Sequence, residues 1–288
     1  MEFLKLKTQQ KSLRFLKKPN KKLKQILLIL FFSSLIINVF SIFYSSDKHF
    51  QSIENQQDYL IRYNVYNKNE IIEGYHTKIK SSDELNIAIS KKSEDFNLEK
   101  MNNLIFESIQ HSDKREILFF ENWSQWILSK IYNPLKKTQD ATLIVDSGMG
   151  ICSEVVTVMK KIALTNNLNS RIIGLNGHVL IEVYIDDKWY LADPDYGFIF
   201  DSSYEQILSL DNVQIKSLIS KKLSSRGFND KFTDTYFNIF TSIDDNIILS
   251  EGEFLSQRLY FLEMTLKSFN WFFTLISFFM LLFFYKRK

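Results

Sequence analysis

Two long apolar runs constrain the fold of this chain more than any other feature. Residues 26–44 carry no charge over nineteen positions, which as a helix would extend roughly 28 Å, close to the hydrocarbon thickness of a bilayer. Residues 269–285 are seventeen uncharged positions with Trp271 and Tyr285 near the two ends, where such rings favour the membrane interfaces. A buried core helix is the alternative for each run, and we favour transmembrane helices over 25–44 and 269–285.

The charges beside these runs predict an orientation in the membrane. Residues 1–24 hold nine basic residues and one acidic residue, and the chain ends in Lys-Arg-Lys. Removing both flanks from the totals of 36 basic and 33 acidic residues leaves 24 and 32 between them, a net charge of −8. Basic flanks favour the cytoplasmic side. We therefore expect cytoplasmic tails at 1–24 and 286–288, and an extracytoplasmic region between the two spans.

Two other interpretations of the basic, apolar N-terminal region are less favourable. As a cleaved signal peptide, the first run is long, and the "SIFYSSDKHF" that follows lacks a small-x-small cleavage pattern. Lysines beside a span usually contact anionic lipid, so we expect a membrane lipid partner and no nucleic acid. The Lys-, Asn-, Ile- and Phe-rich composition is typical of an AT-rich bacterial genome, which favours a bacterial plasma membrane.

The region between the spans divides into three parts. Residues 45–116 are polar with apolar residues at helical spacing, and Asp83 and Asp95 are candidate helix caps. A helical pattern in "FFENWSQWILSKIYNPL", with Pro134 marking its end, opens a core over 117–200. Residues 201–268 are mainly helical by pattern, and their Phe and Tyr residues are expected to pack.

The only cysteine, Cys152, lies where the chain concentrates its unusual backbone geometry. One cysteine forms no internal disulfide. After it, "SEVVTVMKKIALTNNLN" has a helical apolar face that includes Val155, Ile162 and Ala163, with Val158 or Met159. A cysteine at a helix N-terminus favours the thiolate, although a lone cysteine is more often a small buried residue. Five of the eight glycines lie nearby, at Gly148, Gly150, Gly174, Gly177 and Gly197.

Further along, "HVLIEVYI" and "KWYLADPD" form a β-hairpin pattern around Asp186-Asp187. With this two-residue loop, Leu180 lies opposite Asp193, and His178 lies diagonal to Asp193 on the same face. A three-residue loop would place Asp193 on the other face. The two-residue loop is therefore the prediction that brings His178 and Asp193 within side-chain reach.

A metal site is not favoured by the motifs. Asp193 and Asp195 alternate as in a calcium loop, but Gly197 stands at the fifth position and Tyr204 at the twelfth, where a calcium loop needs glutamate. Zinc requires more cysteine or histidine than this segment contains. We expect no metal and no cofactor. The sequence suggests no partner for the remaining histidines, His49, His76 and His111.

Taken in order, these residues resemble the core of the transglutaminase-like superfamily, thiol enzymes with a papain-like fold. That family's pattern is a glycine-flanked cysteine opening a helix, an arginine-led strand, a Gly-His, and a tryptophan-containing strand that ends in Asp-Pro. The resemblance covers roughly 117–200, under a third of the chain. It departs at Leu180, where the family often has an aromatic residue, and at Asp195, where a small hydroxyl residue is common. The matching residues are Cys152, Arg171, Gly177-His178, Trp189 and Asp193-Pro194.

The resemblance implies an α+β fold with a papain-like transglutaminase core, flanked by helices and anchored by two transmembrane helices. It implies a nucleophile at Cys152, a general acid and base at His178, and an orienting carboxylate at Asp193. The expected activity is peptidase, amidase or transglutaminase-type acyl transfer on a protein or peptide substrate outside the cytoplasm. The alternative is a non-catalytic module of the same fold that binds a polypeptide or a cell-envelope component.

Overall fold

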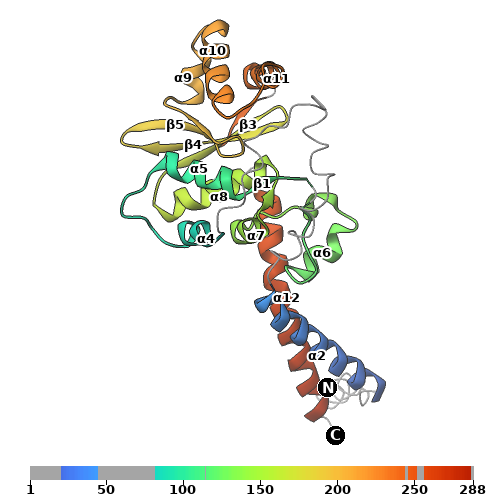
Figure 1. Ribbon diagram of the computed structural model, residues 1–288. Helices are drawn as coiled ribbons and strands as arrows, with labels where there is room; N and C mark the ends of the chain where they lie inside the picture. Colours follow the sequence, from blue (N-terminus) through green and yellow to red (C-terminus); the bar gives the residue numbers. More distant parts are fainter. Residues whose placement is uncertain (1–20, 45–81, 114, 244–245, 252–255, 287–288) are drawn as a thin grey trace, which may run out of the picture.

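The computed structural model describes residues 21–44, 82–113, 115–243, 246–251 and 256–286. Over these residues the protein is α+β, with ten α-helices, one 3₁₀ helix and a five-stranded sheet. Figure 1 shows the sheet and most helices in one domain, with two long helices extending from it. Most of the predicted basic tail lies outside the described residues, as do residues 45–81 with His49 and His76.

The two long helices are α2 (Lys21–Phe43) and α12 (Gln257–Lys286), and both are long and apolar enough to cross a membrane. They pack side by side (Figure 1), with Phe31 and Phe278 in ring contact at 5.3 Å. Most of their apolar side chains are exposed, which argues against buried core helices. Helix α12 begins before the second apolar run and continues through it without a break.

The larger sheet is antiparallel throughout, with strand order β6-β5-β4-β3-β7. The β4–β5 hairpin pairs Ile185 with Lys188, so Asp186 and Asp187 form a two-residue loop as predicted. Both loop residues have positive φ, 50° and 59°, as a type I′ hairpin turn requires. The strands are β3 (Ser170–Leu175), β4 (His178–Ile185), β5 (Lys188–Asp193), β6 (Phe198–Phe200) and β7 (Ile247–Ile248).

Helices cover both faces of this sheet (Figure 1). Because strand side chains alternate, Ile181 packs with helix α8 (Cys152–Thr165) on one face, while Leu180 packs against the helices of the other face. The apolar face of α8 carries the residues predicted for it, which are all buried. The second face is covered by α9 (Tyr204–Leu208), α10 (Asn212–Ser224) and α11 (Asp230–Thr241).

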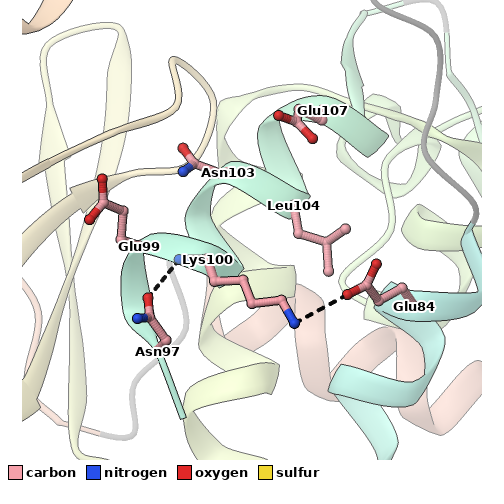
Figure 2. Close-up of a pocket in the computed structure, with 7 residues that line it drawn as sticks. All are labelled: Glu84, Asn97, Glu99, Lys100, Asn103, Leu104 and Glu107. Carbon is pink, nitrogen blue, oxygen red and sulfur yellow. Dashed lines mark hydrogen bonds and ion pairs between the residues drawn. The ribbon is translucent and has the colours of Figure 1, made fainter. Parts of the chain in front are cut away.

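Helices α4 (Ser82–Ser90) and α5 (Leu98–Ser108) pack beside α8. The prediction that Asp95 caps a helix is wrong, because Asn97 is the N-cap of α5 and accepts a 2.8 Å bond from the Lys100 N–H. Asp83 lies in the first turn of α4. A surface pocket lies between these helices, where Lys100 reaches Glu84 (Figure 2). It contains none of the three predicted catalytic residues.

The predicted helix in "FFENWSQWILSKIYNPL" is shorter than its pattern. Helix α6 runs over Trp123–Ser129 and is capped by Asn122. Pro134 lies in the first turn of the 3₁₀ helix η4 (Asn133–Lys136), where a missing N–H has no consequence. Helix α7 (Ala141–Ser147) follows, and then the short strand β2 (Met149–Gly150), which pairs in parallel with β1 (Gln110–His111).

Candidate active site

Cys152 is the first residue of α8, and the segment before it is closely packed. Gly148 ends α7 with a left-handed φ of 63°. The buried Glu154 accepts the N–H of Ile151 at 3.1 Å, which secures the first turn of α8. A Cβ on Gly150 would lie 3.0 Å from the Cβ of Glu154, so glycine leaves the space that this carboxylate uses. The Cys152 side chain itself is partly exposed.

His178 begins β4, and Asp193 is the last residue of β5. The Nε2 of His178 lies 2.7 Å from Oδ2 of Asp193, and both side chains are buried. The two-residue hairpin loop produces this contact, because it places the two side chains on the same face in diagonal positions. The predicted proximity of these two residues is confirmed.

The carboxylate of Asp193 is held by more donors than His178 alone. The Tyr236 hydroxyl donates to Oδ2 at 2.8 Å, and the backbone N–H groups of Asp195 and Tyr196 each donate to Oδ1 at 3.1 Å. A buried carboxylate is tolerated when its oxygens are bonded in this way. Asp193 is therefore fixed in position and can in turn fix the ring of His178.

Aromatic rings enclose the imidazole. Tyr196 stacks on His178 with ring centroids 4.8 Å apart, and Tyr236 approaches it edge-on at 5.7 Å. Neither tyrosine was identified as a site residue from the sequence. In α11, Tyr236 stands four residues after Phe232 and four before Phe240, so its spacing indicates only a packing face.

Cys152 and His178 interact directly. Burial lowers the pKa of His178. The charge of Asp193 and the hydrogen bond between His178 and Asp193 raise this pKa, and a hydrogen bond to Cys152 and the charge of Cys152 raise it further. The result is a pKa well above the usual range for histidine. Because Asp193 occupies Nε2, Nδ1 is the ring nitrogen that remains to bond the thiol. The three residues predicted from the sequence thus meet in one place.

A second histidine–aspartate pair lies beside the first. Nδ1 of His111 is 2.9 Å and 2.7 Å from the two carboxylate oxygens of Asp195. His111 pairs with Gly150 in the β1–β2 ladder, so it joins the segment before Cys152 to the loop after Asp193. This contact could not be predicted from the sequence, because 84 positions separate the two residues. The two carboxylates that suggested a calcium loop both contact histidines instead.

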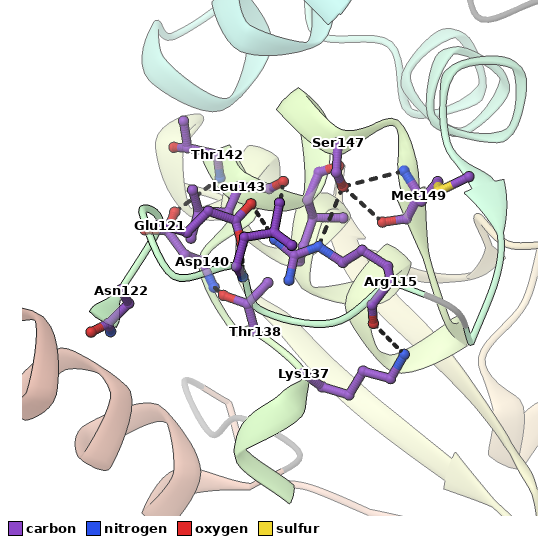
Figure 3. A network of polar contacts seen from close by, with 12 residues as sticks. Arg115, Glu121, Asn122, Lys137, Thr138, Asp140, Thr142, Leu143, Ser147 and Met149 are labelled. Atoms are coloured by element: carbon purple, nitrogen blue, oxygen red, sulfur yellow. Dashed lines mark hydrogen bonds and ion pairs between the residues drawn. The ribbon is translucent and has the colours of Figure 1, made fainter. Parts of the chain in front are cut away.

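A polar network joins Arg115 to Ser147 and Met149 in the segment before Cys152 (Figure 3). The fully buried Arg115 accepts a 2.6 Å bond on its carbonyl from Lys137. Next along the chain, the Thr138 N–H donates to Glu154 at 3.1 Å, while the Thr138 hydroxyl donates to Glu263 of α12. Thr138 therefore links the first turn of α8 to the helix that carries the second apolar run.

Comparisons of the chain with protein-family models, with curated proteins and with solved structures found no match. Among the described residues, no group of three or more His, Cys, Asp or Glu side chains is arranged to hold a metal ion.

Proposed function

We propose that this protein is a membrane-anchored thiol enzyme of transglutaminase-like type that acts on amide or peptide bonds outside the cytoplasm. The observation that carries the proposal is the bonded series of Cys152, His178 and Asp193, in which His178 has a raised pKa. A protonated imidazole beside a partly exposed sulfur favours the thiolate, which is the nucleophilic form of cysteine.

The first half of the proposed reaction forms an acyl-enzyme. The Cys152 thiolate attacks the carbonyl carbon of an amide, and the π electrons of the carbonyl move onto its oxygen. The Cys152 N–H, in the first turn of α8, donates to this oxyanion. The C–N bond then breaks, the leaving nitrogen takes the Nδ1 proton of His178, and a thioester remains on the sulfur.

The second half releases the acyl group. Neutral His178 takes a proton from water or from an amine as that molecule attacks the thioester carbon. The C–S bond breaks, Cys152 leaves as thiolate, and the imidazolium is restored. Water gives a carboxylic acid and an amine gives a new amide, so one site supports hydrolysis and cross-linking. The substrate class is a protein or a peptide.

The arrangement of elements supports the transglutaminase-like part of this proposal. A helix that begins at the cysteine packs on an antiparallel sheet, and the histidine and aspartate lie on adjacent strands of that sheet. Arg171, the arginine of the resemblance, begins β3 with Ser170 and bonds Glu182 of β4 at 2.5 Å. Its guanidinium also stacks on Trp189 at 4.7 Å, which brings two further motif residues together.

Two helices with exposed apolar side chains support the membrane anchor. Their basic flanks support cytoplasmic ends and a domain outside the membrane. Both helices leave the domain on the same side (Figure 1), as a chain that crosses the bilayer twice requires.

The reactivity of Cys152 tests the enzymatic proposal. Because Cys152 is the only cysteine, alkylation of the full chain in membranes reports on it directly. We expect rapid alkylation of the wild type at neutral pH, and slow alkylation of His178→Ala that increases only toward the free-thiol pKa of about 8.5. The Cys152→Ser variant gives the background, and far-UV circular dichroism of each variant verifies folding.

Equal, slow alkylation of the wild type and the folded His178→Ala variant would contradict an activated nucleophile. That outcome would favour the alternative, a module of the same architecture that binds a polypeptide or a cell-envelope component without catalysis. An acyl-enzyme detected by intact mass spectrometry after incubation with an activated peptide ester, and lost in Cys152→Ser, would support the proposed intermediate.

A further inference from the structure

Helix α6 is attached to both long helices at one end. The Trp123 indole N–H donates to the side-chain oxygen of Asn38 in α2 at 3.1 Å. The same indole contacts Phe269 and Phe273 of α12, with ring centroids 6.3 Å and 5.9 Å apart. Asn38 also donates to the Asn270 carbonyl at 2.8 Å. The start of α6 therefore lies beside the last two turns of the first apolar run and the first turns of the second.

Phe120, three residues before the start of α6, also contacts the end of the first apolar run. Phe120 contacts Phe40 at 6.4 Å and Tyr44 at 5.5 Å. Tyr44 is the last residue of the first apolar run. If that run crosses the hydrocarbon core, Tyr44 and Phe120 lie at the boundary with the headgroups, where aromatic side chains are favoured.

The side of α6 that meets the spans continues outward as an exposed apolar face. Trp123, Ile127 and Ile131 stand at intervals of four residues, which places them on one side of a helix. The helical geometry extends beyond Ser129, since the Tyr132 N–H bonds the carbonyl of Leu128 at 2.9 Å. Ile127 is 49% exposed, Ile131 84% and Tyr132 49%. We call these four side chains (Trp123, Ile127, Ile131 and Tyr132) the α6 face.

The charges next to this face fit a lipid surface. The ammonium nitrogen of Lys130 lies over the ring of Trp126, 4.4 Å from its centroid, so a cation held by an aromatic ring adjoins the exposed isoleucines. Exposed isoleucines next to a cation and beside two candidate spans are typical of a segment that lies in the interfacial plane.

We propose that the α6 face inserts into the headgroup and upper acyl region of the extracytoplasmic leaflet, as a third attachment of the domain to the membrane. This inference rests on the proposed insertion of α2 and α12. The partner is a phospholipid surface, chosen because the face is continuous with the two candidate spans through Trp123 and Phe120. Such an attachment holds the domain at one height and one tilt, and therefore fixes how Cys152 meets its substrate.

The test uses single cysteines in the Cys152→Ser background of the full chain. Ile131→Cys carries an environment-sensitive fluorophore, and the protein is reconstituted in phosphatidylcholine vesicles with or without nitroxide-labelled lipid. Phe279→Cys, an exposed position in the second apolar run, controls for insertion of the spans. Val213→Cys, 79% exposed on α10 at the far end of the domain (Figure 1), controls for a surface in water.

We expect the Ile131→Cys label to lose fluorescence to the nitroxide lipid as the Phe279→Cys label does, and to resist aqueous iodide. The Val213→Cys label should show the reverse pattern. If the Phe279→Cys label is quenched by lipid and the Ile131→Cys label behaves like Val213→Cys, the interfacial proposal is wrong while the membrane anchor stands. If none of the labels senses the nitroxide lipid, the anchor itself fails and the inference fails with it.

Discussion

His178 is oriented by Asp193, and Asp193 is held by Tyr236 together with two backbone N–H groups. Tyr236→Phe removes one donor from a buried, ionised carboxylate, which typically costs about 1.5–3 kcal/mol. We expect lower stability, and slower alkylation of Cys152 by an amount smaller than in His178→Ala, because the remaining donors still hold Asp193. Urea denaturation in detergent and alkylation kinetics measure the two effects.

Tyr204→Phe is the matched control for that variant. The Tyr204 hydroxyl donates to the Phe240 carbonyl at 2.8 Å, in the same aromatic cluster but without contacting Asp193. Its loss should destabilise the domain by about 0.5–1.5 kcal/mol and leave the alkylation rate unchanged. Equal alkylation rates in the Tyr236 and Tyr204 variants would show that Tyr236 has no role in positioning Asp193.

The raised pKa of His178 predicts a pH dependence of stability. A group whose pKa is raised by folding stabilises the folded protein fully below its unfolded pKa, about 6.5 for histidine, and this contribution is lost as pH rises through the folded pKa. In the Cys152→Ser background, where no thiol can release a proton on folding, the free energy of unfolding should therefore fall more steeply above pH 6.5 when His178 is present than in His178→Ala. The difference in slope should not exceed about 1.36 kcal/mol per pH unit.

Denaturation between pH 6 and pH 9 measures this difference. Tyr236 does not interfere in this range, because burial and the charge of Asp193 raise its pKa well above the ordinary value for tyrosine. Parallel pH profiles with and without His178 in the Cys152→Ser background would mean that Asp193 does not raise the proton affinity of the imidazole on folding, and would remove the electrostatic argument for the thiolate.

Among the elements, the start of α8 is closely packed around Gly150. In Gly150→Ala the new Cβ would lie 3.0 Å from Cβ of Glu154 and 3.4 Å from Cγ2 of Ile144. Overpacking of this kind costs about 1–3 kcal/mol. We expect the first turn of α8 to shift, and the alkylation of Cys152 to slow. Thermal unfolding and alkylation kinetics in the full chain report on these two effects.

Gly227→Ala is the comparison for that variant. Gly227 has a φ of 85°, and no described atom lies within 4 Å of a Cβ placed there. Alanine at this position should destabilise the protein by about 1–2 kcal/mol through backbone strain, and it should leave the alkylation rate of Cys152 unchanged. If Gly150→Ala alkylates at the wild-type rate despite a similar loss of stability, the packing beneath Cys152 is irrelevant to its reactivity.

Local patterns predicted the elements that carry the site. The register of the β4–β5 hairpin follows from the Asp186-Asp187 loop and the alternation of strand side chains, both of which lie within sixteen residues. The apolar face of α8 is equally local. The prediction of a helix cap at Asp95 is wrong because Asp95 and Asn97 are both residue types that cap helices. The extended backbone is at Asn97, so Asn97 caps α5.

The partners around the site could not be predicted, because tertiary packing brings them from distant positions. Tyr236 stands 43 residues after Asp193, and its contact depends on how α11 packs on the sheet. His111 meets Asp195 only because β1 pairs with β2. Neither contact follows from a periodicity or a spacing, so a single sequence contains no signal for it.

At the scale of the whole molecule, several hydrogen bonds and an ion pair connect the domain to α2 and α12. Glu263 accepts the Thr138 hydroxyl and, at 2.6 Å, the Gln139 N–H. Lys267 pairs with Asp140 at 2.6 Å, and Asn38 meets Trp123. Each contact joins segments at least 85 residues apart in the chain. The two long helices and the domain are thus packed as one body, and the candidate site has a defined orientation relative to the helix axes.

The proposed topology places that body on the outer side of the membrane. In the Cys152→Ser background, Val213→Cys tests the domain, and Lys286→Cys tests the end of α12. A membrane-impermeant maleimide applied to intact cells that produce the variants should modify the Val213 variant and should reach the Lys286 variant only after permeabilisation, because basic flanks are retained on the cytoplasmic side. The opposite pattern would place Cys152 in the cytoplasm. The substrate would then be a cytoplasmic protein, even if the chemistry of Cys152, His178 and Asp193 were unchanged.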